Sequence, residues 1–372
     1  LTLAGFCCLA SEGWAWQAEL EQEQEQAEAP ATLEDLLVTA SLEPLSVQDV
    51  AASVTVITRE QIEQRQVRYL GDLLRDVPGF NVSQSGGPGA QTQVRVRGGE
   101  ANQLLVLLDG VRANDPASAD EFRFEYALTA DIERIEIVRG PVSTVWGSDA
   151  VSAVVNIIRR KEVRDNFAAG HAEYGSFNTV DLAANGGVDL GAAQLRAGFA
   201  WNDTDGINAS RTGSEKDGAT NSTLDLGLDW SLAEALVLGV TGQFTDSENQ
   251  FDGLSFLTSL PEDSDRVTRA KRTFLGSDLR WSPADGPWSA SANLNWTDTD
   301  NENFSDGLFD TRTAAEVLDL RLRASRLFEG RHEQEHRLTA AFDYIDTQFL
   351  QRGTATAFGD PNQDQGYDQA SF

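Results

Sequence analysis

The sequence predicts an N-terminal α+β domain followed by a transmembrane antiparallel β-barrel, of which about the first nine strands are present. Three observations support this prediction. Residues from about 45 to 160 mix short β-branched runs with helical spacing, and residues from about 167 onward alternate apolar and polar side chains with a period of two. The connections between the later runs alternate between short and long.

Charge and composition exclude some classes of protein. The chain has 372 residues, with 29 Lys and Arg against 59 Asp and Glu, and a formal net charge of -30. Such a charge repels phosphates, so we expect no nucleic-acid binding. The chain has no Met, even at position 1, so we expect its true start to be missing. Its only cysteines are Cys7 and Cys8, which exclude a disulfide framework or a Cys-ligated metal site further along.

The first residues read as a targeting segment and a tether. The opening LTLAGFCCLA is a short apolar run, and Gly13-Trp14-Ala15 after it has the small-x-small pattern that signal peptidase cuts. We therefore expect residues 1–15 to be the remnant of a signal peptide. Residues 16–44 form a periplasmic tether, because Glu19 to Pro30 is acidic, Gln-rich and without apolar periodicity. No other apolar run is long enough for a membrane-spanning helix.

Residues 45–162 are predicted to form the α+β domain. Ser53 to Ile57 reads as a strand, and Thr58 with Gln61 forms a capping box for the helix that follows. Tyr69 to Val77 has helical spacing and is stopped by Pro78-Gly79. Further short strands are expected at 94–96, 104–108, 135–138 and 154–158, with a turn at Asp109-Gly110.

Residues 163–372 are predicted to form barrel strands. Leu224, Leu226, Leu228 and Trp230 alternate with Asp225, Gly227 and Asp229, and similar runs occur at 193–202, 288–296 and 318–323. Short turns near 190, 234 and 286 alternate with long polar loops at 203–221, 246–272 and 298–315. A soluble sandwich would have short turns at both ends. Tryptophans near both kinds of connection mark the two rims of a membrane band. The last residues, GYDQAS before Phe372, read as a loop.

A short strand-forming patch lies between the tether and the folded domain. Its six residues are Asp35, Leu36, Leu37, Val38, Thr39 and Ala40. Such a patch can add a strand to the open sheet edge of a partner protein, where main-chain hydrogen bonds provide the affinity.

DLLVTA resembles the TonB box of TonB-dependent outer-membrane receptors, and the domain after it resembles their plug. The matching stretches, in the order of the family, are SVTVITREQIEQ, LGDLLRDVPGFNV, VRVRGGEANQLLVLLDGVRAND and IERIEIVRGPVSTVWGSDAVSAVVNII. The resemblance implies a plug inside a barrel of about 22 strands in the bacterial outer membrane. It also implies that TonB, with its inner-membrane energising complex, is a partner, and that outer-membrane lipid surrounds the barrel.

Within the family, NVSQSGGPGAQTQVRVRG followed by LLVLLDGVRAND is most similar to the cobalamin transporters. The resemblance places substrate at the plug apex, against these residues: Ser83, Gln84, Ser85, Gly86, Gly87, Gly89, Asn114 and Asp115. Glycines permit a tight loop with positive φ, and the Ser and Gln side chains can hydrogen-bond to an amide-rich ligand such as cobalamin. The alternative for the glycine run is a simple turn. Arg97 and Arg139 lie at plug positions that face the barrel wall in the family, where a guanidinium can pair with a barrel carboxylate.

Two loops are rich in carboxylates that suit calcium, namely Asp203, Asp205, Asp217 and Asp252. This pattern resembles that of the cobalamin branch, which uses loop aspartates to bind calcium, so calcium is an expected ligand of the extracellular loops. The other interpretation is that these are solvated acidic loops. No other cofactor is required.

No nucleotide-binding, zinc-protease or hydrolase motif is present, so we expect a transporter and not an enzyme. The alternatives to a corrinoid substrate are a ferric siderophore or haem, and, outside the family, a passive porin.

Overall fold

The structure is a computed structural model. It describes residues 37–38, 45–46, 52–146, 150–159, 163, 165–210, 213–254, 258, 261–284, 286–329, 335–355 and 360–371. The expected signal-peptide remnant, the tether and most of the TonB box lie outside these residues. Of the TonB box, Leu37–Val38 forms strand β1, which pairs antiparallel with β2 (Leu45–Ser46).

The N-terminal domain contains short strands and short helices. Its elements are β3 (Ser53–Thr58), α2 (Arg59–Arg65), α3 (Leu70–Leu74), β4 (Phe80–Gln84), β5 (Thr92–Val96), η3 (Ala101–Gln103), β6 (Leu104–Leu108), β7 (Val111–Arg112), η4 (Pro116–Ser118), η5 (Phe124–Tyr126), β8 (Ile132–Arg139), α4 (Ser143–Trp146) and β9 (Ala153–Arg159). Five of the strands form a sheet in the order β3-β8-β9-β6-β7, in which only β6 and β9 are parallel, and β4 and β5 form a separate hairpin. None of the helices in the described part of the chain is long and apolar enough to cross a membrane.

The core of this domain forms because apolar side chains recur on one face of each element. Leu70, Leu73 and Leu74 of α3 are fully buried against Ile135 and Ile137 of β8 in one cluster. The strand β6 is buried along its whole length, as expected for a strand covered on both faces. The predicted strands and both predicted helices are therefore confirmed, although the second helix is shorter than its sequence pattern.

Local signals in the sequence set the ends of these elements. The capping box at α2 is present, since Gln61 N–H donates to Thr58 Oγ1 at 3.4 Å and Thr58 N–H donates to Gln61 Oε1 at 3.1 Å. The Asp109-Gly110 turn between β6 and β7 has φ values of 53° and 84°. A turn with two positive φ values matches the twist of the strands that it joins.

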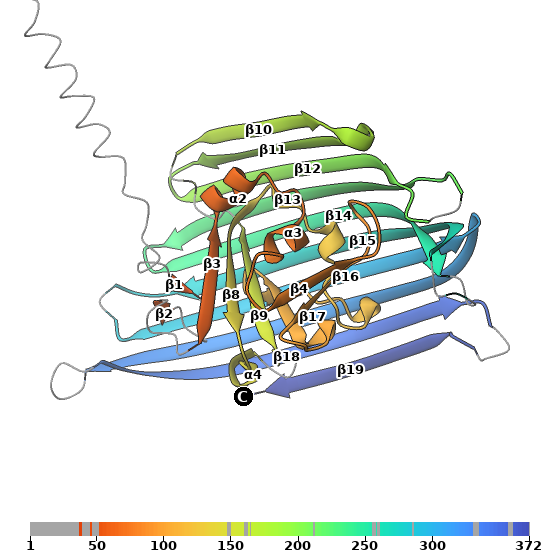
Figure 1. The fold of residues 1–372 in the computed structure, drawn as a ribbon. Helices are drawn as coiled ribbons and strands as arrows, with labels where there is room; N and C mark the ends of the chain where they lie inside the picture. Colours follow the sequence, from red (N-terminus) through yellow and green to blue (C-terminus); the bar gives the residue numbers. More distant parts are fainter. Residues whose placement is uncertain are drawn as a thin grey trace, which may run out of the picture.

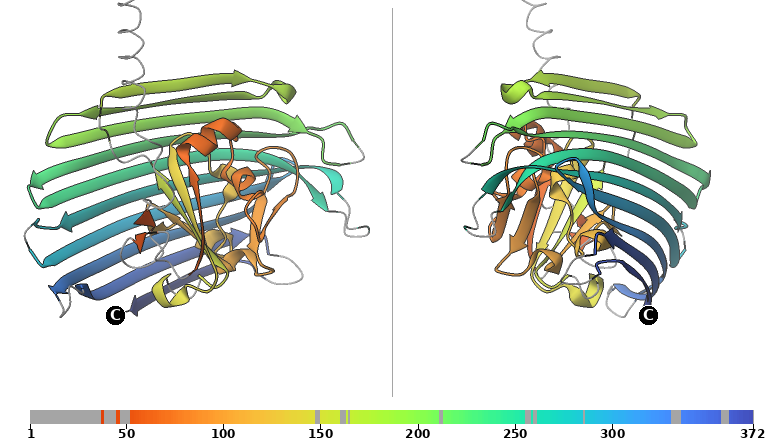
Figure 2. Two further views of the ribbon diagram at one scale, coloured as in Figure 1. Left: turned by 60° about the vertical axis from the view of Figure 1, so that its left-hand side comes forward. Right: turned by 90° about the vertical axis from the view of Figure 1, so that its right-hand side faces the viewer.

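The C-terminal half is one antiparallel sheet in which ten strands follow each other in chain order. They are β10 (Phe167–Tyr174), β11 (Val180–Asp189), β12 (Ala193–Ile207), β13 (Asp217–Ala233), β14 (Leu236–Leu254), β15 (Pro261–Trp281), β16 (Trp288–Ser305), β17 (Leu308–Glu329), β18 (Glu335–Gly353) and β19 (Gln363–Ser371), with η6 (Ser176–Asn178) between β10 and β11. The sheet curves, and the N-terminal domain packs against its concave face (Figures 1 and 2). We call the two parts the plug and the wall.

The wall is apolar outside and polar inside. On β13, Leu224, Leu226 and Trp230 are 39%, 44% and 46% exposed, whereas Thr223 and Asp225, which point to the other face, are buried. This is the reverse of a soluble protein, in which strands hide their apolar face. The predicted alternation is confirmed.

The long polar connections are mostly strand and not loop, which corrects the sequence prediction. The turns between β12 and β13, β14 and β15, and β16 and β17 are confined to 208–216, 255–260 and 306–307. The strands continue past the apolar band because opposite charges face each other across them. Arg312 Nη2 lies 2.6 Å from Asp300 Oδ2, and Arg269 Nε lies 2.7 Å from Glu248 Oε2. Gly366 to Ser371, which reads as a loop, is likewise part of β19.

Candidate functional site at the plug and the wall

The plug apex consists of Ser83 and Gln84 at the end of β4 and the loop 85–91 that leads to β5, and we call residues 83–91 the apex loop. A Cβ atom added to Gly89, which has a φ of +83°, would lie 2.4 Å from Cβ of Ala219, and one added to Gly87 would lie 3.2 Å from Ile207. Ile207 and Ala219 lie where β12 ends and β13 begins, on the long-loop side of the wall. Glycine therefore allows the apex loop to touch the wall directly.

The side chains of the apex loop divide into internal supports and exposed hydroxyls. Gln84 Nε2 donates to the Gly87 carbonyl at 2.7 Å and closes the loop from within. Ser83 and Ser85 are exposed, and of the two only Ser85 has a weak internal hydrogen bond, 3.4 Å long, to the carbonyl of Gln91. The two hydroxyls are therefore available to a ligand, and substrate contact at the apex loop stays a prediction.

Asn114 and Asp115 are held by hydrogen bonds to the protein, and their substrate contact stays a prediction. Asn114 Oδ1 accepts from Val106 N–H at 2.8 Å, and its Nδ2 donates to the Leu104 carbonyl at 3.0 Å and the Asp120 carbonyl at 2.7 Å. Both residues are buried, at 6% and 5% exposure. The amide of Asn114 thus makes three hydrogen bonds inside the plug, which leaves one lone pair of its Oδ1 for a further donor.

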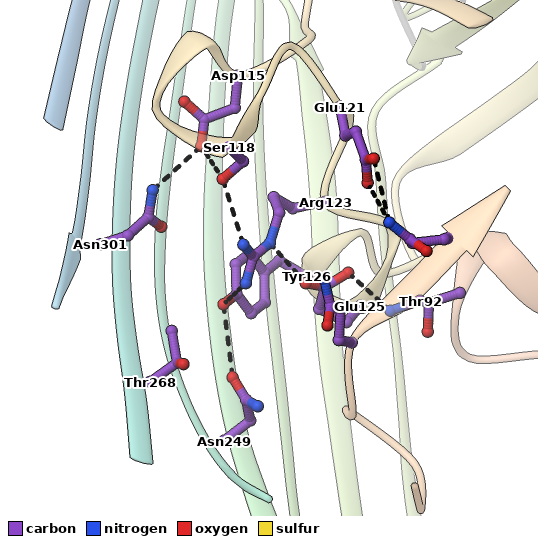
Figure 3. Close-up of polar contacts among 12 residues, drawn as sticks. Thr92, Asp115, Ser118, Glu121, Arg123, Glu125, Tyr126, Asn249, Thr268 and Asn301 are labelled. Carbon is purple, nitrogen blue, oxygen red and sulfur yellow. Dashed lines mark hydrogen bonds and ion pairs between the residues drawn. The ribbon is translucent and has the colours of Figure 1, made fainter. Parts of the chain in front are cut away.

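Asp115 joins the plug to the wall. Its carboxylate accepts from Asn301 Nδ2 at 3.1 Å on β16 and from Ser118 Oγ at 2.8 Å within the plug (Figure 3). It also accepts from Thr299 Oγ1 at 2.8 Å, again on β16. The sequence analysis missed this role because nothing in the residue order indicates which wall strand lies opposite.

Arg123 is the centre of a buried network that extends from the plug hairpin to β14 (Figure 3). It donates to Glu125 Oε1 at 2.6 Å and to Tyr126 Oη at 2.8 Å, and Tyr126 Oη lies 3.5 Å from Asn249 Oδ1 on the wall. Burial lowers the pKa of Arg123, but Glu125, Tyr126 and Asp115 together outweigh it and hold the pKa above its usual range. Burial raises the pKa of Tyr126 to about 12, so its hydroxyl stays a donor at any physiological pH.

Among the described residues, Arg159 makes the most buried ionic contact between plug and wall. It is the last residue of β9, is 4% exposed, and donates to Asp109 Oδ2 at 2.8 Å in the plug and to Asp225 Oδ1 at 3.0 Å on β13. Its guanidinium carbon lies 5.6 Å from the ring centroid of Phe274 on β15. The sequence analysis did not single it out, although a charge at the end of the otherwise apolar run VVNII was the available signal.

Most of the wall beneath the plug carries uncharged hydrogen-bonding side chains. The buried ones are Asn202, Thr204, Asn221, Thr223, Ser247, Asn249, Thr268, Asn295, Thr299 and Asn301. Direct bonds to the plug include Tyr69 Oη to Asn202 Oδ1 at 2.7 Å and Asn221 Nδ2 to the Tyr126 carbonyl at 3.0 Å. A cavity of about 80 Å³ between plug and wall, next to Arg159, has room for a few waters. Water can replace such bonds one by one, so the surface suits a plug that separates from the wall.

Arg139 and Arg97 bond within the plug. Arg139 Nη2 donates to Thr55 Oγ1 at 2.9 Å and its Nη1 to the Pro78 carbonyl at 3.0 Å, which ties β8 to the start of the plug sheet. Arg97 has a φ of 52°, and its backbone N–H donates to the Gly79 carbonyl at 2.8 Å. The expected contacts of these two residues with barrel carboxylates stay a prediction.

The four aspartates predicted to bind calcium fall into two groups. Asp203 accepts from Thr220 Oγ1 at 2.5 Å, and Asp205 pairs with Lys216 at 3.3 Å. Asp217 and Asp252 instead face a separate carboxylate cluster around Glu215. Burial first, and then the carboxylates of Asp265, Asp263, Asp217 and Asp252, raise the pKa of Glu215. Within the described ranges, no group of three or more His, Cys, Asp or Glu side chains is already placed to hold a metal ion.

Known proteins resemble both halves of the chain. Residues 46–154 match the family described as TonB-dependent Receptor Plug Domain. The Vitamin B12 transporter BtuB of Vibrio vulnificus (strain CMCP6) is 37% identical over 175 residues, which cover 45% of this chain and 28% of that protein.

Solved structures share the fold at low sequence identity. The alcaligin outer-membrane receptor FauA of Bordetella pertussis has a TM-score of 0.70 at 20% identity, over 89% of this chain and 53% of that one. The ferripyoverdine receptor of Pseudomonas aeruginosa has a TM-score of 0.70 at 15% identity, over 90% of this chain and 50% of that one. The chain thus spans about half the length of these structures. The chain thus contains a TonB-dependent receptor plug domain at residues 46–154, followed by a ten-stranded sheet that shares its fold with part of these outer-membrane receptors.

Proposed function

We propose that this chain belongs to a transporter that imports a corrinoid such as cobalamin across the outer membrane, with energy supplied through TonB. The observation that carries the corrinoid proposal is the uncharged apex loop, which presents the hydroxyls of Ser83 and Ser85 beside glycines that touch the wall. A ligand rich in amides needs neutral donors and acceptors, whereas an anionic iron chelate favours cations. The 37% identity with a Vitamin B12 transporter supports the same substrate.

The proposed mechanism assigns a task to each part of the chain. Substrate binds at the apex loop and the outer ends of the wall strands. TonB then pairs with the TonB box in the periplasm and pulls on the plug. The energy for this step comes through TonB, because the outer membrane has no nucleotide supply of its own. The uncharged bonds between plug and wall are exchanged for bonds to water, and the ionic contacts of Arg159 set the resistance to the pull.

Substrate binding is tested on the purified protein with cyanocobalamin and with a ferric catecholate chelate, which is anionic. We expect measurable affinity for cyanocobalamin only. Replacing both Ser83 and Ser85 by Ala removes two hydrogen bonds of about 0.5–1.5 kcal/mol each, and should weaken binding about tenfold. Ser231→Ala is the matched control, because Ser231 is an exposed serine at the short-turn end of β13. Tighter binding of the ferric chelate would favour the other candidate function, that of a siderophore receptor. The solved receptors for alcaligin and ferripyoverdine share the fold of this chain.

We also propose that calcium binds the carboxylate cluster at Glu215, Asp217 and Asp252 when the neighbouring loops close on it. Asp252 Oδ2 is buried without a hydrogen-bond partner among the described residues, and the carboxylates of Asp217 and Asp252 add to burial in raising the pKa of Glu215, which supports a cation there. Calorimetry with calcium alone should show binding that Asp217→Asn with Asp252→Asn weakens at least tenfold. Asp203→Asn, which lies outside the cluster, should have little effect. Equal losses in both variants would contradict this grouping.

A further inference from the structure

Among the described residues, Arg326 places a guanidinium on the outward face of the wall at its short-turn rim. In the sheet register, Arg326 of β17 lies opposite Trp288 of β16, beside the short turns before β16 and after β17. Outward residues further along these two strands are apolar as far as the other tryptophan rim, and include Ala290, Ala292, Leu294, Leu318, Leu320, Leu322 and Ala324. Arg326 is thus the first charge at this edge of the lipid-facing band on β17.

Two aromatic rings hold this guanidinium. The guanidinium carbon of Arg326 lies 5.1 Å from the ring centroid of Trp288 and 4.6 Å from that of Phe328. Both rings are partly exposed, at 48% and 38%. Stacking of this kind uses the face of the guanidinium, so the N–H donors in its plane remain for an acceptor.

No carboxylate of the described residues forms an ion pair with Arg326, in a chain whose net charge is -30. The contrast with Arg269 is direct. Arg269 also lies over an aromatic ring, 4.9 Å from the centroid of Phe304, but its Nε donates to Glu248 Oε2 at 2.7 Å. The two sites have similar stacking, and they differ in that a described carboxylate pairs with Arg269 and none of the described carboxylates pairs with Arg326.

We propose that Arg326, between Trp288 and Phe328, binds the phosphate of a glycerophospholipid in the inner leaflet of the outer membrane. This inference rests on the membrane placement of the barrel and not on its substrate. Tryptophans at a barrel rim lie at the level of the lipid headgroups, where phosphate oxygens are the abundant acceptors. The guanidinium fork matches a phosphate with two parallel hydrogen bonds, and the side-chain stem lies along apolar surface.

The test is native mass spectrometry of the detergent-purified protein. The protein is offered dioleoyl phosphatidylglycerol together with a monogalactosyl diacylglycerol of the same acyl chains, which has no phosphate. We expect the phospholipid to be retained preferentially, and Arg326→Gln to lower its retention about tenfold. Arg326→Lys should restore part of the retention. Arg269→Gln, which removes the guanidinium that already has a carboxylate, should leave retention unchanged.

Three results would overturn the proposal. Equal retention by the wild type and Arg326→Gln would show that acyl-chain contacts alone hold the lipid. Equal retention of the two lipids by the wild type would show that the phosphate is not recognised. Displacement of the lipid by inorganic phosphate would show a site for a free anion. The result does not depend on the corrinoid, because a receptor for another substrate would give the same lipid preference.

Discussion

Deletion of Leu36 to Thr39 is expected to abolish uptake of labelled cyanocobalamin in cells while leaving binding to the cell surface intact. The deletion removes most of the strand that we propose TonB pairs with, and strand addition depends on a continuous row of main-chain donors and acceptors. Without that pairing no force reaches the plug, so bound substrate stays outside. Uptake and surface binding are measured in the same cells with the same label.

A deletion of equal length in the acidic tether controls for the shortened chain. Removing Glu21 to Gln24 leaves the TonB box intact and takes residues from a segment that has no apolar periodicity. We expect near-normal uptake in that variant. Normal uptake without the TonB box would instead favour a passive pore, and the proposed energy coupling would have to be abandoned.

Arg159→Met is expected to weaken the attachment of the plug by about 3 kcal/mol or more. Met fills a similar volume but leaves the carboxylates of Asp109 and Asp225 facing each other without the cation between them. Removing one partner of a buried ion pair is costly because the other charge remains desolvated. Amide hydrogen exchange along β9 should become roughly a hundredfold faster, which corresponds to a loss of about 3 kcal/mol in the free energy of opening.

An exposed ion pair provides the matched control. Arg65 of α2 pairs with Asp76 at 3.3 Å, with side chains 38% and 74% exposed, so Arg65→Met should change the opening free energy by about 0.5 kcal/mol or less. Adding Asp225→Asn to Arg159→Met should restore part of the protection, because it removes one of the two uncompensated charges. Unchanged exchange in Arg159→Met would show that the plug is held elsewhere.

The parts of the fold that follow from local physics could be predicted from the sequence. The alternation at Leu224 to Trp230 determines which face of β13 meets lipid, because the side-chain period of a strand is two. Likewise the Thr58 and Gln61 side chains satisfy N–H groups within their own turn of chain, so α2 could be placed without knowledge of the tertiary structure.

The parts that depend on pairing between distant segments could not be predicted. The polar stretches around Glu248 and Asp300 read as loops, since their alternation of apolar and polar residues is lost. In the structure the backbone ladder continues through them, and opposite charges on the neighbouring strands add to it. Asp115 and Arg159 are separated by 184 and 66 residues from their wall partners Thr299 and Asp225. A sequence read in one dimension carries no signal for such contacts.

The way in which plug and wall are joined has a consequence for repeated use of the protein. Strand β9 ends at Arg159 and the first wall strand, β10, begins at Phe167, so the plug is covalently connected to the wall through a segment that spans at most about 25 Å. A plug pulled away from the wall therefore returns by an intramolecular reaction, at an effective concentration in the millimolar range, about what a short flexible linker gives. In the proposed mechanism, closure after each round of import then needs no diffusional search. Arg159, which ends β9 next to this connection, is among the first residues that can re-form its contact with Asp225.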